Sequence, residues 1–184
     1  MARKAQAVGE QCPPGDALVV AHSLGAVPAA LAYRAGDLPA SHVVLLEPAL
    51  YDVARGQGAV ERHITAMTEA RECAEAGDLF GFWQIVGPLM LGRPATRDSW
   101  HEDQTLARLL ADVDAPWGHG IEGSVFAAVP TLVVTGDWSD EYEGIAQQMT
   151  VAGAEHVCLP GAKHRPQDHP GFESVLSEFT GTHR

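Results

Sequence analysis

Basic residues and cysteines are scarce in this sequence. It has 12 lysines and arginines against 24 aspartates and glutamates, which gives a formal net charge of −12. Because an acidic surface gains nothing by releasing counterions from a polyanion, we expect neither a nucleic acid partner nor an anionic membrane surface. The three cysteines, Cys12, Cys73 and Cys158, lie far apart. Their odd number and wide spacing predict neither a disulfide framework nor a metal cluster.

Long apolar runs are also lacking. No segment approaches the about 20 apolar residues of a membrane-spanning helix. The residues after Met1 do not lead into an apolar stretch of the secretory-signal type. Together with the cysteine pattern, this predicts a cytoplasmic protein. Apolar residues nevertheless make up 46% of the 184 residues, so the chain can bury a sizeable core.

Short apolar runs bounded by turn residues are typical of buried parallel strands. Four such runs are Ala17–Ala21, Val43–Glu47, Thr131–Thr135 and His156–Leu159. Helical patterns separate them, beginning with the alanine-rich stretch from Leu24 to Tyr33. The alternation of strands and helices predicts an α/β fold whose parallel sheet is covered on both faces.

Residues 51–127 show helical patterns and interrupt this alternation. Their apolar character is strongest around four large side chains: Phe80, Phe82, Trp83 and Met90. Such residues either pack the interior of a helical unit or line a pocket for an apolar group of a substrate. Ser99 and Glu102 have the spacing of a helix capping box. We therefore predict a core made of residues 1–50 and 128–184, with a helical cap inserted at 51–127.

The segment from Ala21 to Gly25 joins the first expected strand to the helix that follows it. It matches the nucleophile elbow G-x-S-x-G around Ser23, with Ala21 in place of the first glycine. Small residues on either side permit the strained turn that such an elbow needs. The alternative is a serine that caps an ordinary helix. Ser23 is therefore a candidate nucleophile, and the backbone N–H of Leu24 is a candidate oxyanion donor.

Two later segments complete a resemblance to the α/β-hydrolase superfamily, in its serine-nucleophile branch. Residues 130–136 resemble the late strand that precedes the acid-bearing loop, and residues 159–164 resemble the turn that delivers the catalytic histidine. The chain order of nucleophile, acid and histidine is the same. The resemblance implies that His164 is the general base. His169 lies deeper in the same loop, and His22 is expected to line the pocket.

The carboxylate that completes the triad is less clear. The position at which most of the family carries it corresponds to Ser139. Asp140 comes one residue later, but with Glu143 it has the spacing of a helix N-cap pair. Glu47, at the carboxyl end of its strand, occupies an alternative acid position that some members use. We favour Glu47, with Asp140 as the alternative and Asp137 third.

The resemblance implies a serine hydrolase that cleaves a small carboxylic ester through an acyl-enzyme, without a metal or an organic cofactor. The alternative is a non-catalytic remnant of the α/β-hydrolase fold that acts as a binding or interaction domain. Fewer residues precede Ser23 than the roughly 30 of one βαβ unit. We therefore expect a truncated sheet without the early strands and without the early loop that donates a second oxyanion N–H. Weak activity and self-association through the exposed first strand should follow.

Overall fold

The computed structural model describes residues 1–13, 15 and 17–182. Its four strands form one parallel sheet in the order β1-β2-β3-β4. The strands are β1 (Ala17–His22), β2 (Ala40–Leu46), β3 (Thr131–Thr135) and β4 (Glu155–Cys158). The predicted α/β fold with a parallel sheet is confirmed. Strand β2 starts three residues earlier than the apolar run indicated, because its first residues are only half buried.

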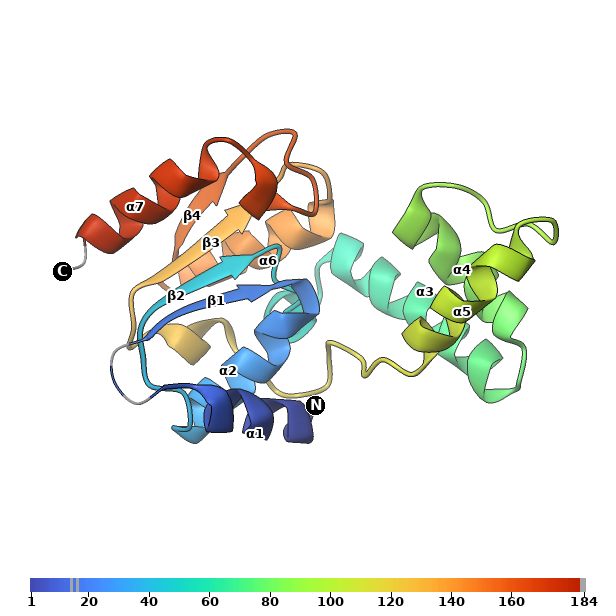
Figure 1. The fold of residues 1–184 in the computed structure, drawn as a ribbon, viewed down its shortest axis with the longest axis horizontal. Coiled ribbons are helices and arrows are strands. Elements are labelled where there is room, and N and C mark those ends of the chain that lie inside the picture. The colour runs from blue at the N-terminus through green and yellow to red at the C-terminus, as the bar shows by residue number, and fades with distance from the viewer. Residues whose placement is uncertain (14, 16, 183–184) are drawn as a thin grey trace. The chain divides into compact units, whose positions relative to one another are not determined.

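Helices cover the two faces of this sheet (Figure 1). The first unit of the chain contains four α-helices: α1 (Ala2–Gln11), α2 (Ala26–Ala35), α6 (Asp140–Val151) and α7 (Phe172–Thr182). It also contains four short 3₁₀ turns: η1 (Ser23–Gly25), η2 (Tyr51–Ala54), η3 (Gly123–Phe126) and η4 (Pro166–Asp168). Helix α7 packs on one face, whereas α2 and α6 run along the other (Figure 1). None of the helices in the described part of the chain has the length and apolarity that a membrane span requires.

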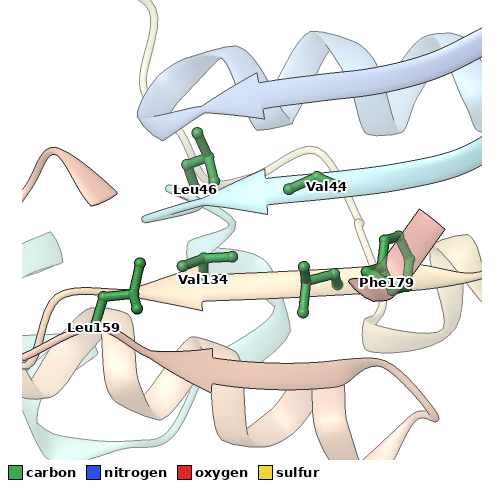
Figure 2. Packing of buried hydrophobic residues seen from close by; sticks show 6 residues of the cluster. Val44, Leu46, Val134, Leu159 and Phe179 are labelled. Carbon is green, nitrogen blue, oxygen red and sulfur yellow. The ribbon is translucent and has the colours of Figure 1, made fainter. Parts of the chain in front are cut away.

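The core beneath α7 shows how strand register builds a packed face. Val44 of β2 lies beside Leu132 of β3, and Leu46 lies beside Val134. Side chains two residues apart point to the same face of a strand, so these four form one apolar layer. Leu159 and Phe179 close the layer, and each of the six is at most 8% exposed (Figure 2). Burying each large side chain contributes about 1.5–3 kcal/mol, which holds α7 against the sheet.

Strand β1 is an edge strand of the sheet that the described residues form. Val20 pairs in register with Val44, so it belongs to the same face as the core beneath α7. However, Val20 is 49% exposed and Leu18 is 43% exposed. The apolar face therefore continues, uncovered, onto a strand whose outer backbone groups have no strand partner among the described residues. This is the surface for which the sequence predicts self-association.

Residues 61–115 form a second compact unit. Its helices are α3 (Gly58–Glu75, which begins in the first unit), α4 (Leu79–Leu91) and α5 (Trp100–Ala111). This unit is narrower than the predicted cap, because residues 51–60 and 116–127 belong to the first unit. Phe82 and Trp83 are fully buried in its interior, whereas Met90 is 56% exposed. Packing, and not a substrate pocket, accounts for Phe82 and Trp83.

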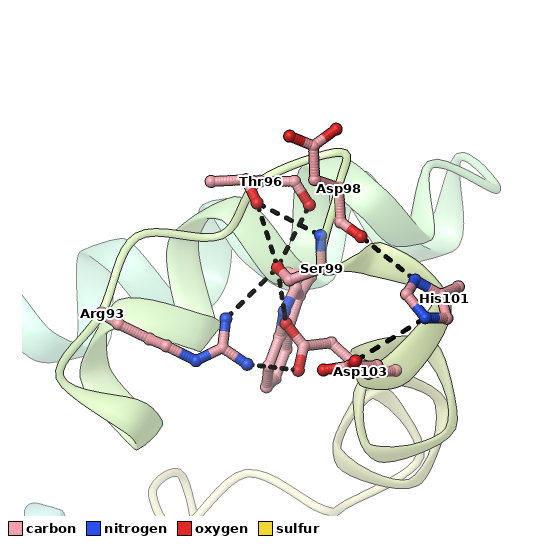
Figure 3. A network of polar contacts seen from close by, with 8 residues as sticks. Arg93, Thr96, Asp98, Ser99, His101 and Asp103 are labelled. Atoms are coloured by element: carbon pink, nitrogen blue, oxygen red, sulfur yellow. Dashed lines mark hydrogen bonds and ion pairs between the residues drawn. The ribbon is translucent and has the colours of Figure 1, made fainter.

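A buried carboxylate organises the polar side of this second unit (Figure 3). Asp103 is 6% exposed and accepts hydrogen bonds from Trp83 Nε1 at 3.0 Å, Arg93 Nη2 at 2.7 Å and Ser99 Oγ at 3.2 Å. The indole donor holds the pKa of Asp103 below its usual range, and Arg93 adds to the effect. The predicted capping box is wrong. Ser99 stands at the N-cap position but makes no side-chain cap bond to the first turn of α5. Its hydroxyl donates to Asp103 instead.

Candidate active site

The turn after β1 presents Ser23 in a strained conformation. Ser23 has a φ of 52°, in the left-handed region, and begins η1 directly after the strand. A non-glycine residue in that region costs roughly 1–2 kcal/mol, so the surrounding packing must hold it there. The helix-cap alternative is wrong, because the N-cap positions of η1 and α2 are His22 and Gly25. Leu24 follows in η1, where its N–H lies at the start of the helical run.

His164 meets this serine from the loop after β4, the strand at the opposite edge of the sheet. Its Nε2 lies 3.0 Å from Ser23 Oγ. If Ser23 donates its hydroxyl proton to Nε2, the single proton of a neutral imidazole must be on Nδ1. The backbone of His164 is held as well, because His22 Nε2 donates to its carbonyl at 2.7 Å. His22 thus supports the histidine loop, and burial lowers its pKa below the ordinary value.

Glu47 is the carboxylate that faces His164 among the described residues. It is completely buried, and it follows β2 with a φ of 44°. Its Oε1 accepts from the Gly136 N–H at 2.6 Å, and its Oε2 accepts from Trp138 Nε1 at 2.9 Å. The same Oε2 lies 3.9 Å from His164 Nδ1. That distance is too long for a hydrogen bond, and the buried Nδ1 has no hydrogen-bond partner within the described chain.

The other predicted acids and the competing histidine lie elsewhere. Asp140 is exposed and begins α6, where Ser139 is the N-cap without a side-chain cap bond, so the predicted cap pair with Glu143 is wrong. Asp137 is also exposed, and its N–H donates to Glu143 Oε1 at 3.3 Å. His169 accepts from the Gly171 N–H, within its own loop. The structure therefore brings Ser23, His164 and Glu47 together and leaves these residues apart.

Comparison with known families places the chain in a wider group. A family model described as the alpha/beta hydrolase family matches residues 2–173. The chain belongs to the alpha/beta hydrolase family. A comparison with curated proteins gave no match.

Solved structures share the fold of this α/β-hydrolase at low sequence identity. MenH from S. aureus has a TM-score of 0.55 and 16% identity, covering 91% of this chain and 69% of MenH. The putative non-heme bromoperoxidase BpoC from Mycobacterium tuberculosis has a TM-score of 0.57 and 17% identity, covering 100% and 74%. A carboxyl esterase from Bacillus coagulans has a TM-score of 0.50 and 14% identity, covering 97% and 69%. At these identities the likeness concerns the fold alone.

Two aromatic residues of this α/β-hydrolase lie against His164. The sequence did not predict this contact. The rings of Trp138 and Tyr142 lie 5.5 and 5.2 Å from the imidazole, centroid to centroid. Tyr142 is 8% exposed, and burial raises its pKa to about 12, while hydrogen bonding to Tyr51 and Ser23 opposes that rise. Trp138 lies in the loop before α6 and Tyr142 lies in its first turn, so no helical spacing marked the pair in the sequence.

Gly136 joins the acid to the histidine loop. A Cβ at this position would lie 2.1 Å from the carbonyl oxygen of Lys163, so the backbones approach too closely for any other residue. The same Gly136 N–H binds Glu47. Lys163 itself has a φ of 52°, which shows that the loop before His164 is tightly constrained. The absence of a side chain at Gly136 therefore sets the distance between β3 and His164.

A group of potential metal ligands lies beside the same strand ends. Asp137, Glu143 and Cys158 each offer one ligand atom, and these atoms lie within 4.8 Å of one another. Burial and the neighbouring carboxylates raise the pKa of the Cys158 thiol, which disfavours the thiolate that a metal would need. Asp137 and Cys158 are exposed, and exposed acidic groups commonly meet without an ion. We assign no metal site to these three residues.

Proposed function

We propose that this α/β-hydrolase is a serine hydrolase that cleaves small carboxylic esters through an acyl-enzyme. One observation carries the proposal: the hydroxyl of a strained serine, Ser23, lies 3.0 Å from the Nε2 of His164. Nucleophile and general base in such contact are the minimum that acyl transfer requires. The serine nucleophile also argues against the branches of the family that use an aspartate.

Acylation follows from the positions of these groups. As Ser23 Oγ attacks the ester carbonyl carbon, its proton passes to His164 Nε2 and the carbonyl oxygen becomes an oxyanion. The Leu24 N–H at the start of the helical run is the proposed donor to this oxyanion. Collapse of the tetrahedral intermediate breaks the bond to the alcohol oxygen, which takes the proton from His164. The acyl group is then bonded to Ser23 Oγ.

Deacylation repeats the sequence with water. As a water molecule attacks the acyl carbon, His164 removes one of its protons. The same proton is returned to Ser23 Oγ when the ester bond to the enzyme breaks. In both steps the imidazole passes through its charged form, which a neighbouring carboxylate stabilises. Glu47 is the proposed carboxylate. For a full hydrogen bond, its Oε2 and His164 Nδ1 must approach from 3.9 Å by about 1 Å.

The long acid–histidine distance is also the observation that favours the second candidate function. A site whose Nδ1 lacks a hydrogen-bond partner among the described residues need not activate its serine. In that case the chain would be a non-catalytic member of the family that binds or interacts through the same fold. The two functions predict different nucleophilicities for Ser23, and a chemical probe can measure this difference.

A fluorophosphonate probe and p-nitrophenyl acetate test the proposal together. The wild-type protein should be labelled and should release p-nitrophenol, and Ser23→Ala should abolish both while its melting temperature stays close to the wild-type value. Ser124→Ala is the matched control, because Ser124 is exposed and lies in η3. A wild-type protein that the probe does not label would favour the binding function. Labelling retained in Ser23→Ala would assign the reactive serine to another position.

A further inference from the structure

Trp138 contacts both the acid and the base of the proposed triad. Its indole N–H donates to Glu47 Oε2 at 2.9 Å. Its ring meets the His164 imidazole edge-on, with 5.5 Å between centroids and 73° between planes. Glu47 Oε2, which accepts from the indole, also lies 3.9 Å from His164 Nδ1. One side chain therefore lies at the contact on which the acid–base pair depends.

The hydrogen bonds of Glu47 show why this indole matters. Its other oxygen, Oε1, is held by the backbone N–H of Gly136 at 2.6 Å, and that donor is fixed by the sheet. Oε2 is the oxygen that faces His164 Nδ1, at 3.9 Å. An indole has one N–H and no acceptor, so its bond to Oε2 anchors that oxygen and withdraws negative charge from it. A hydrogen bond to an ionised acceptor is roughly twice as strong as a neutral one, so the anchor is firm.

The two donors to Glu47 also differ in mobility. The Gly136 N–H belongs to the buried backbone directly after β3, whereas the Trp138 side chain is 44% exposed and lies in the loop between β3 and α6. Rotation of a half-exposed side chain disturbs little packing, whereas movement of the buried carboxylate would break its bond to Gly136. The indole is therefore the partner whose position can change the contact between Glu47 and His164.

We propose that Trp138 is a positioning residue that restrains the Glu47–His164 contact by anchoring Glu47 Oε2 at 3.9 Å from His164 Nδ1. This inference rests on the proposed serine hydrolase function. With the indole N–H in place, the carboxylate shares its charge between two donors and stabilises the imidazolium less. Without it, Oε2 carries more negative charge and is less restrained, so His164 Nδ1 can approach it and the protonated imidazole persists to higher pH.

Among the described residues, the titratable groups near His164 are Glu47 after β2, His22 from β1, Tyr142 from α6 and Arg165, which follows it in the chain. Burial lowers the pKa of His22, and the pKa of Tyr142 is raised to about 12, so both are uncharged in neutral solution. Arg165 keeps its charge throughout, because its contact with Asp168 raises its pKa. His22, Tyr142 and Arg165 are the same in the wild type and in a Trp138 variant, so the difference between their pH midpoints reports the His164–Glu47 pair.

The rate at which a fluorophosphonate labels Ser23 should be measured from pH 5 to pH 9. Trp138→Phe keeps an aromatic ring against His164 but removes the N–H donor. We expect its midpoint to rise by about one pH unit, the scale that one hydrogen bond to a charged group sets. Trp117→Phe is the matched control, because it makes the same change at a tryptophan that packs on Tyr51. In the double variant Trp138→Phe with Glu47→Gln, the shift should disappear, because the effect passes through Glu47.

Each outcome decides the inference separately from the function. If Trp138→Phe lowers the plateau rate and leaves the midpoint unchanged, Trp138 only packs against the site and the proposal is wrong. A midpoint shift that persists in the double variant would also overturn it. If the wild-type protein is not labelled, the proposed function fails. The His164 midpoint is then measured by proton NMR titration in the wild type and in Trp138→Phe, with His164→Gln to assign the resonance, and it must still rise.

Discussion

Replacing Glu47 with glutamine is the most direct test of which carboxylate serves His164. In the variant, an amide NH2 must face either the Gly136 N–H or the Trp138 indole, both of which are donors. The buried site therefore loses one charge-assisted hydrogen bond, which costs about 1.5–3 kcal/mol. A loss of this size is tolerable for a domain whose total stability is roughly 5–15 kcal/mol. It should lower the melting temperature by about 3–12 °C.

The effect on catalysis follows from the 3.9 Å between Glu47 Oε2 and His164 Nδ1. At this distance Coulomb's law gives about 4 kcal/mol with an effective dielectric constant near 20, and about 1 kcal/mol in bulk water. The His164 side chain is 36% exposed, so the real value lies between these limits. Loss of the charge should reduce turnover by roughly 5- to 1000-fold.

The assay compares p-nitrophenyl acetate hydrolysis by Glu47→Gln and Asp140→Asn, below the melting temperature of each. Asp140→Asn is the matched control, because it neutralises an exposed carboxylate at the start of α6 and should change turnover less than twofold. If Asp140→Asn lost more turnover than Glu47→Gln, the catalytic acid would be assigned to Asp140. A folded Glu47→Gln protein with wild-type turnover would show that the 3.9 Å contact contributes nothing to the reaction.

Three further predictions concern the frame around the site. Gly136→Ala should destabilise the fold by about 1–3 kcal/mol and reduce turnover, because its Cβ would meet the Lys163 carbonyl; unchanged urea unfolding would refute this. Burial lowers the pKa of His22, so the unfolded chain binds more protons and stability should fall as the pH drops below about 6.5. The decline should be shallower in His22→Gln, measured by urea midpoints at pH 7 and pH 5. Val20→Lys should shift the protein from self-associated species to monomer in light scattering, and a wild-type protein that is monomeric at all concentrations would contradict the edge-strand argument.

The sequence was sufficient for features that depend on neighbouring residues. Apolar runs between turn residues located all four strands of the described chain, although only β3 is buried along its whole length. The residues around Ser23 predicted a strand, a tight turn and a helix, and the structure has them in that order. His164 was distinguished from the other histidines by the turn after β4, and its ring does reach Ser23. These are local patterns, and local sequence encodes them.

Contacts across the sheet were not predictable in the same way. The bond between Trp138 and Glu47 joins residues 91 positions apart, and it depends on how β2 and β3 are aligned. A tryptophan after a strand carries no mark of the carboxylate that it will meet. Ser99 shows the same limit on a smaller scale. Its spacing from Glu102 fits a cap, but the nearby buried Asp103 offers a charged acceptor, and the tertiary contact takes precedence.

The position of the second unit in the chain has a consequence for how the protein can vary. Strands β2 and β3 lie side by side, yet residues 61–115 are inserted between them. Without this insertion, about a third of the connecting chain would remain. Because the entropy of closing a loop grows by only about 0.6 kcal/mol for each doubling of length, the insertion costs the strand pairing about 1 kcal/mol. The helical unit has its own interior around Trp83. It can therefore be lengthened, shortened or exchanged during evolution while the strands that carry Ser23, Glu47 and His164 remain paired.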